Sequence, residues 1–178
     1  MSAPPEKTGY VIEPLGKRHD RAAFSCGGAA LDTYLHKQAS QDARRRVAAP
    51  FVLVKPPSPV VIGYYTLSQM SVHLGDLPPD IAKKLPKYPE VPVTLIGRLA
   101  RAEGHRGHGI GELLLMNALR RSWVLSSEIA AFAVVVDAKD ERAGAFYERY
   151  EFQPFPDQPQ HLFMPMAKLD KLFSEHNP

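Results

Sequence analysis

Four glycines within eight residues mark the part of the chain best suited to bind an anion. They lie in the run Gly104–Gly111, which also holds two histidines and one arginine. An apolar run, Val93–Ile96, precedes them and predicts a buried strand, and helix-forming residues follow over Glu112–Arg121. The first turn of a helix has unsatisfied N–H donors and a positive dipole end, and glycine lets an anion approach the backbone closely. The run therefore predicts a phosphate-binding loop, with a plain glycine-rich turn as the alternative.

The spacing of the glycines narrows the choice of phosphate ligand. A Walker loop needs a lysine after its last glycine, and none follows here. The dinucleotide fingerprint Gly-x-Gly-x-x-Gly does not match Gly107-x-Gly109-x-Gly111. The pattern that fits is Arg-x-x-Gly-x-Gly, with Arg106 as its first residue.

The elements that would position this loop alternate between strands and helices. The strands are predicted over Tyr10–Leu15, Phe51–Val54, Val60–Leu67, Val93–Ile96, Ala131–Val136 and His161–Met166. Helices are predicted over Ala29–Arg45, Glu112–Arg121 and Glu141–Arg149, with a helical turn over Pro79–Lys84 and an irregular turn over Gln153–Gln160. The continuous apolar run before Asp137 predicts a strand buried on both faces, so we expect an α/β fold with helices on each side of a mixed sheet.

The composition is that of an ordinary globular domain. Of 178 residues, 44% are hydrophobic and 23% are charged, and no apolar run approaches the ~18 residues of a membrane span. The single cysteine, Cys26, excludes an internal disulfide and a cysteine-based zinc site, and the seven histidines lack metal-ligand spacing. We expect a cytoplasmic protein with no metal and no membrane association. A net charge of +3 mildly favours an acidic partner.

Two basic clusters have both a structural and a functional interpretation. The first ends the helix predicted over Ala29–Arg45, and the second lies in a proline-rich segment over Asp76–Val91. Cations suit a helix C-terminus and an exposed loop, where they stay solvated. They also suit contacts with the phosphates of a nucleic acid. The clusters comprise Arg44, Arg45 and Arg46, and Lys83, Lys84 and Lys87.

Four further motifs, taken with the glycine loop, resemble the GNAT acyltransferases over nearly the whole chain. They are Phe24-x-Cys26-Gly27 followed by Leu31-Asp32-x-Tyr34-Leu35; Gly63-Tyr64-Tyr65-Thr66-Leu67-Ser68; Pro86-x-Tyr88-Pro89-x-Val91-Pro92-Val93 running into Gly97-Arg98-Leu99-Ala100; and Asp137-Ala138-Lys139-Asp140 leading to Phe146-Tyr147-Glu148. Together they resemble the GNAT toxins of bacterial toxin–antitoxin pairs, which acetylate the α-amine of aminoacyl-tRNA and so stop translation. One departure is Arg98-Leu99-Ala100-Arg101-Ala102, where the common pattern is Arg-Leu-Ala-Val-Asp.

This resemblance implies an architecture and a set of partners. A single GNAT domain over residues 10–173 would follow a flexible tail over residues 1–9. Its mixed, mostly antiparallel and twisted sheet would be flanked by helices on both faces. The resemblance also implies acetyl-coenzyme A as co-substrate, aminoacyl-tRNA as acceptor, a ribbon-helix-helix antitoxin as partner, and a homodimer.

The resemblance also implies roles for particular residues. The pyrophosphate of acetyl-coenzyme A would be held by the backbone N–H groups of Gly107, His108, Gly109, Ile110 and Gly111, with a charge-assisted contact from Arg106. The pantetheine amides would pair with a strand edge formed by Leu99, Ala100 and Arg101, which would also help polarise the thioester carbonyl. Arg44–Arg46 and the three lysines would contact the tRNA. Tyr147 would act as general acid and protonate the departing thiolate, although the residues alone favour core packing for Tyr147, as for Phe146 and Tyr150.

No residue stands out as a general base, and an α-amine acceptor asks little of one; whether a base is used stays open at this point. An α-amine with a pKa near 7.7–8.0 is neutral in roughly a tenth of molecules at pH 7, whereas a lysine amine near 10.4 is neutral in about one in two thousand. The nearest carboxylates, Glu103 and Glu148, are expected to be solvated.

Two other functions remain open from the sequence. The acceptor could be a protein N-terminus, a polyamine or a small-molecule amine. Alternatively, the chain could hold coenzyme A as a non-catalytic binding module.

Overall fold

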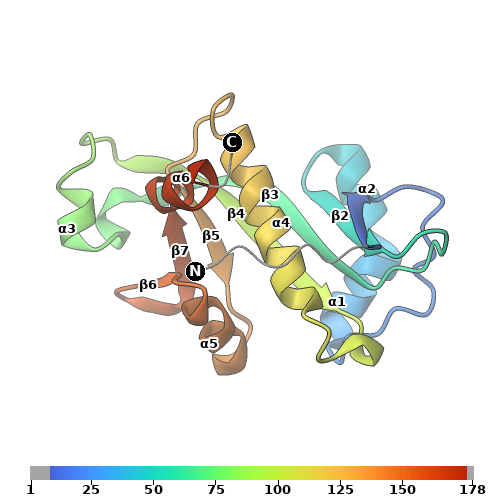
Figure 1. Ribbon diagram of the computed structural model, residues 1–178. Coiled ribbons are helices and arrows are strands. Elements are labelled where there is room, and N and C mark those ends of the chain that lie inside the picture. Colours follow the sequence, from blue (N-terminus) through green and yellow to red (C-terminus); the bar gives the residue numbers. More distant parts are fainter. Residues whose placement is uncertain (1–8, 176–178) are drawn as a thin grey trace. The chain divides into compact units, whose positions relative to one another are not determined.

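The computed structural model describes residues 9–175 (Figure 1). The N-terminal elements are β1 (Val11–Pro14), α1 (Ala29–Thr33), the π-helix η1 (Tyr34–Gln38), α2 (Ala39–Arg45), β2 (Ala49–Val54) and β3 (Gly63–His73). The middle of the chain forms the 3-10 helix η2 (Leu74–Asp76), α3 (Pro79–Ala82), β4 (Glu90–Arg101), the 3-10 helix η3 (Glu103–His105) and α4 (Ile110–Leu125). The C-terminal elements are β5 (Ala133–Asp137), α5 (Glu141–Arg149), β6 (Gln153–Phe155), β7 (Gln158–Pro165) and α6 (Met166–Ser174).

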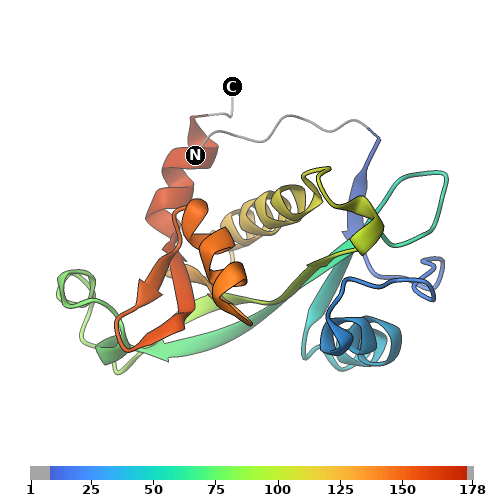
Figure 2. The ribbon, with the colours of Figure 1, turned by 90° about the horizontal axis from the view of Figure 1, so that it is seen from below.

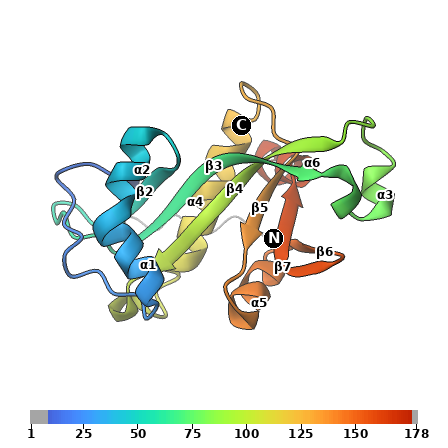
Figure 3. The same cartoon turned by 180° about the vertical axis from the view of Figure 1, so that it is seen from behind.

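One mixed sheet contains seven strands in the order β1-β2-β3-β4-β5-β7-β6. Four of its ladders are antiparallel, and the ladder between β4 and β5 is parallel over Val93–Ile96. The strands β3 and β4 are neighbours and the longest of the sheet, as Figure 3 shows. The prediction of a mixed, mostly antiparallel sheet is therefore confirmed.

The described chain divides into two compact units. The N-terminal unit comprises residues 9–68 and Gly97–Ala118, and the C-terminal unit comprises Gln69–Ile96 and 119–175. The elements β3, β4 and α4 each contribute residues to both units.

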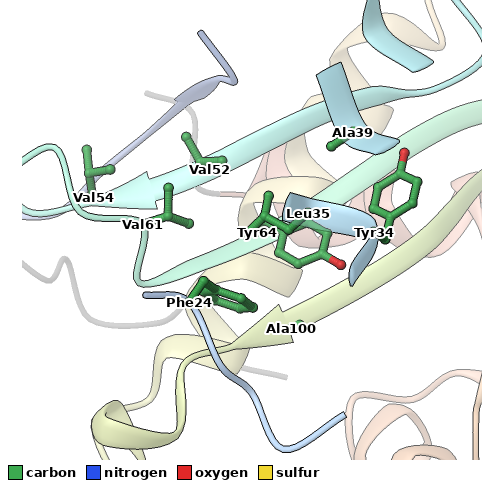
Figure 4. Packing of buried hydrophobic residues seen from close by; sticks show 9 residues of the cluster. All are labelled: Phe24, Tyr34, Leu35, Ala39, Val52, Val54, Val61, Tyr64 and Ala100. Carbon is green, nitrogen blue, oxygen red and sulfur yellow. The ribbon is translucent and has the colours of Figure 1, made fainter. Parts of the chain in front are cut away.

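The N-terminal unit has helices on both faces of its part of the sheet. Successive strand residues point to opposite faces, and Tyr64 and Tyr65 of β3, both fully buried, illustrate this. The ring of Tyr64 stacks on that of Tyr34, from η1, with 6.3 Å between ring centroids. The Tyr65 hydroxyl donates a hydrogen bond of 2.7 Å to the side chain of Asn117, from α4. Figure 4 shows the core on the η1 side, where Phe24 and Ala100 also pack.

The C-terminal unit is built on β5, whose residues Ala133 to Val136 are all buried. This agrees with the strand predicted from the apolar run, although it begins two residues later than Ala131. Helices α5 and α6 both pack against β7, the antiparallel neighbour of β5 (Figure 2). The helix predicted over Glu141–Arg149 is confirmed, because Asp140 caps it by accepting a 2.8 Å hydrogen bond from the Ala143 N–H.

Two predictions about the C-terminal region were wrong. The segment over Gln153–Gln160 is not an irregular turn, because it contains β6 and the start of β7. Pro154 is tolerated because β6 is an edge strand, where a missing N–H donor breaks no ladder. The chain also does not end on a strand. Helix α6 follows, and buries Met166, Leu169 and Phe173 at helical spacing.

Other predicted boundaries shift without changing an element's type. The helix predicted over Ala29–Arg45 is interrupted by the π-helix η1, which local propensity does not signal. Strand β3 begins at Gly63 rather than Val60 and continues to His73. Of the predicted tail over residues 1–9, residues 1–8 lie outside the described part of the chain.

Candidate active site

The glycine run forms an exposed loop that leads directly into α4. Gly107 and Gly109 have φ angles of +77° and +68°, in the left-handed region that favours glycine. Residues 106–109 are exposed, and a Cβ added at Gly107 would meet no heavy atom within 4 Å. Helix α4 begins at Ile110, two residues earlier than predicted, so Gly111 lies in its first turn. The loop thus combines an open approach to the backbone with the positive end of a 16-residue helix.

Close packing with β3 anchors the start of α4. The Ile110 side chain is fully buried. A Cβ added at Gly63 would lie only 2.8 Å from Leu114 Cδ1 and 3.1 Å from the Ala100 carbonyl oxygen, so only glycine lets β3 approach this closely. The Ala102 N–H also donates a 2.8 Å hydrogen bond to the Ile62 carbonyl. The loop therefore projects from a rigid base.

The segment before α1 supports the other end of the loop. The Glu103 N–H donates a 2.9 Å hydrogen bond to the Ser25 carbonyl. Gly27 has a φ of +88°, and a Cβ there would lie 2.8 Å from Glu103 Oε1. The positive φ angle gives a structural reason for glycine in the Phe24-x-Cys26-Gly27 motif. Cys26 itself is partly buried.

The predicted pantetheine-binding edge occupies the last residues of β4. Leu99 and Arg101 are half-buried, while Ala100 is buried in the core with Tyr64. All three residues follow Ile96, which is the last residue of β4 in the ladder with β5.

The phenol of Tyr147, in the C-terminal unit, lies on the buried side of α5. Tyr147 is 7% exposed, and its ring meets Phe146 and Phe152 edge-on at centroid distances of 5.2 and 5.4 Å. Phe146 and Tyr150 are only half-buried, so the structure distinguishes Tyr147 from its aromatic neighbours, as the sequence could not.

The environment of Tyr147 keeps its phenol protonated. Burial raises the pKa of Tyr147 to about 12, with a smaller contribution from the negative charge of Asp137. The Asp137 carboxylate is itself paired with His161 across the β5–β7 ladder. A phenol with this pKa holds its proton at any physiological pH, which a proton donor requires.

The two basic clusters are exposed. Arg44 and Arg45 lie in the last turn of α2, and Arg46 ends the helix in the left-handed conformation with a φ of +57°. Lys83, Lys84 and Lys87 follow α3. The expected solvation of Glu103 and Glu148 is confirmed, because both are exposed.

The sequence model of a known protein family matches this chain. It is described as "Acetyltransferase (GNAT) family" and matches residues 21–152, which is more than half of the chain. The chain belongs to the GNAT acetyltransferase family. The seven-stranded mixed sheet with helices on both faces is therefore a GNAT fold, as the sequence motifs predicted.

Two relatives of this GNAT chain are toxins by name. It is 32% identical over 170 residues to "Probable toxin TacT" of Sinorhizobium fredii (strain NBRC 101917 / NGR234), covering 91% of this chain and 94% of the relative. It is 33% identical over 156 residues to "tRNA-acetylating toxin" of Mycobacterium tuberculosis (strain ATCC 25618 / H37Rv), covering 88% of this chain and 92% of the relative.

Solved structures of the protein AtaT have the same fold as this GNAT chain. AtaT complexed with acetyl-methionyl-tRNAfMet is 29% identical, with a TM-score of 0.86 over 92% of this chain and 99% of AtaT. A tyrosine-to-phenylalanine mutant of the AtaT toxin bound to acetyl-CoA and to the C-terminus of the antitoxin AtaR is 25% identical. Its TM-score is 0.78 over 93% of this chain and 98% of that chain.

One polar cluster of the GNAT domain was not predicted. The guanidinium carbon of Arg98, on β4, lies 3.6 Å from the ring centroid of Tyr34. The Tyr34 hydroxyl donates a 2.8 Å hydrogen bond to Asp42, whose other carboxylate oxygen accepts from the Gln38 side chain at 2.9 Å. Arg98 lies in the Gly97-Arg98-Leu99-Ala100 motif, but no sequence signal paired it with Tyr34, 64 positions earlier. The π-helix places Tyr34 at this point.

A second residue outside the prediction is His105, which immediately precedes the loop. Its ring meets that of His108 edge-on, with 6.0 Å between centroids. Its Nδ1 atom is buried and has no hydrogen-bond partner within residues 9–175.

Among the described residues, no three His, Cys, Asp or Glu side chains lie together as a metal ion would require. No helix of residues 9–175 has the length and apolar character needed to cross a membrane.

Proposed function

We propose that this chain transfers the acetyl group of acetyl-coenzyme A to the α-amine of aminoacyl-tRNA, and acts as the toxin of a toxin–antitoxin pair. The observation that carries the proposal is the glycine loop at the start of α4, exposed over residues 106–109, within a chain about a third identical to a tRNA-acetylating toxin. The same proposal treats residues 10–173 as one catalytic domain.

The loop residues fit the diphosphate of the coenzyme. Gly107 leaves open space where a side chain would block an anion, and Gly109 precedes the first turn of α4. The N–H groups from Gly107 to Gly111 would hold the pyrophosphate, with the exposed Arg106 guanidinium beside it. When bound, acetyl-coenzyme A supplies an acyl thioester, and the backbone of Leu99–Arg101 would orient its pantetheine arm.

Tyr147 would supply the proton that the departing thiolate needs. The pKa near 12 that burial gives this phenol keeps the proton on its oxygen at neutral pH. The chain need supply no strong base for the acceptor, because an α-amine with a pKa near 7.7–8.0 is partly neutral at pH 7. The exposed carboxylates of Glu103 and Glu148 are consistent with this division of roles.

The tRNA would be held through its backbone charge. The exposed clusters Arg44–Arg46 and Lys83–Lys87 would contact phosphates. A ribbon-helix-helix antitoxin with a disordered tail would neutralise the toxin by folding onto it, as AtaR binds AtaT through its C-terminus. A cytoplasmic location is part of the proposal, because charged tRNA is a cytoplasmic substrate. A homodimer is also part of the proposal.

Acetyl transfer to defined acceptors tests the proposal. The purified chain is incubated with labelled acetyl-coenzyme A and, in parallel, with charged tRNA, uncharged tRNA, a polyamine and a peptide with a free N-terminus. We expect label only on charged tRNA, and growth arrest on expression that Tyr147→Phe relieves. Label on the polyamine or the peptide would favour the alternative acceptors, and binding without transfer to any acceptor would favour a coenzyme-binding module.

A further inference from the structure

Arg98 is a half-buried cation that an aromatic ring holds in place. Its guanidinium lies against the Tyr34 ring at 3.6 Å, a separation typical of a cation–π stack. Within residues 9–175, no side-chain hydrogen bond or ion pair joins Arg98 to another residue. An arginine has five N–H donors and stays charged at every physiological pH, so these donors are available to a ligand.

The Asp42 carboxylate interacts electrostatically with Arg98, but its oxygens already accept hydrogen bonds from other groups. Both oxygens of Asp42 accept hydrogen bonds, one from the Tyr34 hydroxyl and one from the Gln38 amide. These bonds fix the Tyr34 ring, and the ring fixes the plane of the guanidinium. A partly buried guanidinium whose N–H donors make no hydrogen bond costs free energy, and an anionic ligand that accepts from these donors would recover it.

The position of Arg98 on β4 places it near the proposed chemistry. Arg98 and Ala100 lie on the same face of the strand, because side chains alternate, and Ala100 packs in the core with Tyr34. Leu99 begins the stretch proposed to orient the pantetheine arm. At about 3.3 Å per strand residue, the Arg98 backbone lies within roughly 10 Å of every residue of that stretch.

We propose that Arg98 binds the phosphodiester that precedes the terminal, aminoacylated nucleotide of the tRNA, and that Tyr34 positions it for this contact. This inference rests on the proposed function. The carboxyl group of the amino acid is esterified in aminoacyl-tRNA, so phosphodiesters are the anions that every aminoacyl-tRNA presents near the reactive amine. A planar guanidinium binds a phosphate through two parallel hydrogen bonds, which a lysine cannot do. Arg98 is thus a substrate-binding residue and Tyr34 a positioning residue.

A cycle between protein and RNA variants tests the contact. The full chain, wild-type or Arg98→Ala, acetylates an aminoacylated acceptor-stem minihelix that carries either the natural last phosphodiester or a neutral methylphosphonate there. We expect Arg98→Ala to raise KM by about 10- to 100-fold with the natural minihelix and by less than twofold with the methylphosphonate. The dependence of log KM on log salt should fall by about 0.7 in Arg98→Ala.

Further variants separate a specific contact from general damage. Arg98→Lys keeps the charge but loses the planar group that donates two parallel hydrogen bonds. Its KM should therefore lie between those of wild-type and Arg98→Ala. Tyr34→Leu should raise KM in wild-type but add nothing in Arg98→Ala. Arg120→Ala is the matched control, because Arg120 is exposed and lies 6.0 Å from the Phe173 ring, and its KM should stay within twofold of wild-type.

Two results would overturn the inference, and both differ from a failure of the proposed function. An equal loss by Arg98→Ala on both minihelices would show that Arg98 does not read this phosphate. A weaker affinity for acetyl-coenzyme A in calorimetry of Arg98→Ala would assign the guanidinium to the coenzyme instead. If the wild-type chain acetylates no charged tRNA, the proposed function itself fails.

Discussion

The glycine loop and the surroundings of Tyr147 differ in the groups that they offer: the loop offers exposed backbone, and α5 offers a buried side chain. The loop is exposed backbone, and the anion binding that we propose for it depends on the absence of side chains at Gly107 and Gly109. Tyr147 is a buried side chain, and the burial that raises the pKa of its phenol comes in part from the aromatic rings around it. Substitutions in the loop should therefore act on coenzyme affinity, and substitution of Tyr147 should act on the rate of acetyl transfer.

The sharpest test of this division is Tyr147→Phe, which removes the proton donor and keeps the ring. We expect kcat to fall by about 100- to 10,000-fold, because general acid catalysis contributes about that much. Labelled acetyl transfer gives kcat, and calorimetry should give an unchanged Kd for acetyl-coenzyme A. Tyr150→Phe, on the same helix but half-buried, is the control and should leave kcat within a few-fold of wild-type. A full rate in Tyr147→Phe would remove the phenol from the mechanism.

The converse test is Gly107→Val, which adds a branched side chain where φ is +77°. We expect the Kd for acetyl-coenzyme A to rise by about 10-fold or more, together with a loss of roughly 1–3 kcal/mol of stability from the strained backbone. Calorimetry and thermal unfolding measure the two effects. Gly104→Ala is the matched control, since a Cβ there meets nothing within 4 Å. If Gly107→Val bound the coenzyme normally, the loop would be an ordinary turn.

A third test asks whether a surface outside both regions acts on the acceptor alone. Replacing Arg44, Arg45 and Arg46 together by alanine should raise KM for charged tRNA several-fold and weaken its salt dependence, because phosphate contacts release counterions. The Kd for acetyl-coenzyme A should not change. The same experiment on Lys83, Lys84 and Lys87 decides which cluster contacts the tRNA, and an unchanged KM in both would leave the clusters as solvated surface.

The smallest expected effect is on the pH profile. The rate should rise as the α-amine loses its proton near pH 7.7–8.0 and then stay level to about pH 10. An ordinary tyrosine would begin to lose its proton there, but burial raises the pKa of Tyr147 to about 12, so its acid form persists. Initial rates with an amide-linked aminoacyl analogue, which resists alkaline hydrolysis, give the profile. An alkaline loss centred near pH 10 would mean that the donor is a solvated phenol.

How far the sequence predicted the fold depended on whether a signal was local. The α5 helix was predicted with its true ends because its start carries its own cap, Asp140. The exposed loop was predicted because glycine spacing is itself the signal. The edge strand β6 was missed because Pro154 disfavours a strand locally, and the ladder with β7 overrides that preference. Helix α6 was missed although Met166, Leu169 and Phe173 recur at helical spacing.

The amino-acid sequence by itself determined where the backbone is exposed in a left-handed turn, because glycine at positions 107 and 109 adopts positive φ angles without any distant partner. Only the tertiary structure decided which of three neighbouring aromatic rings is buried, since burial depends on what packs against α5 from elsewhere in the chain. The same holds for Arg98 and Tyr34. Their stack joins a strand to a π-helix far away in the sequence, and a contact of that kind exists only once the chain has folded.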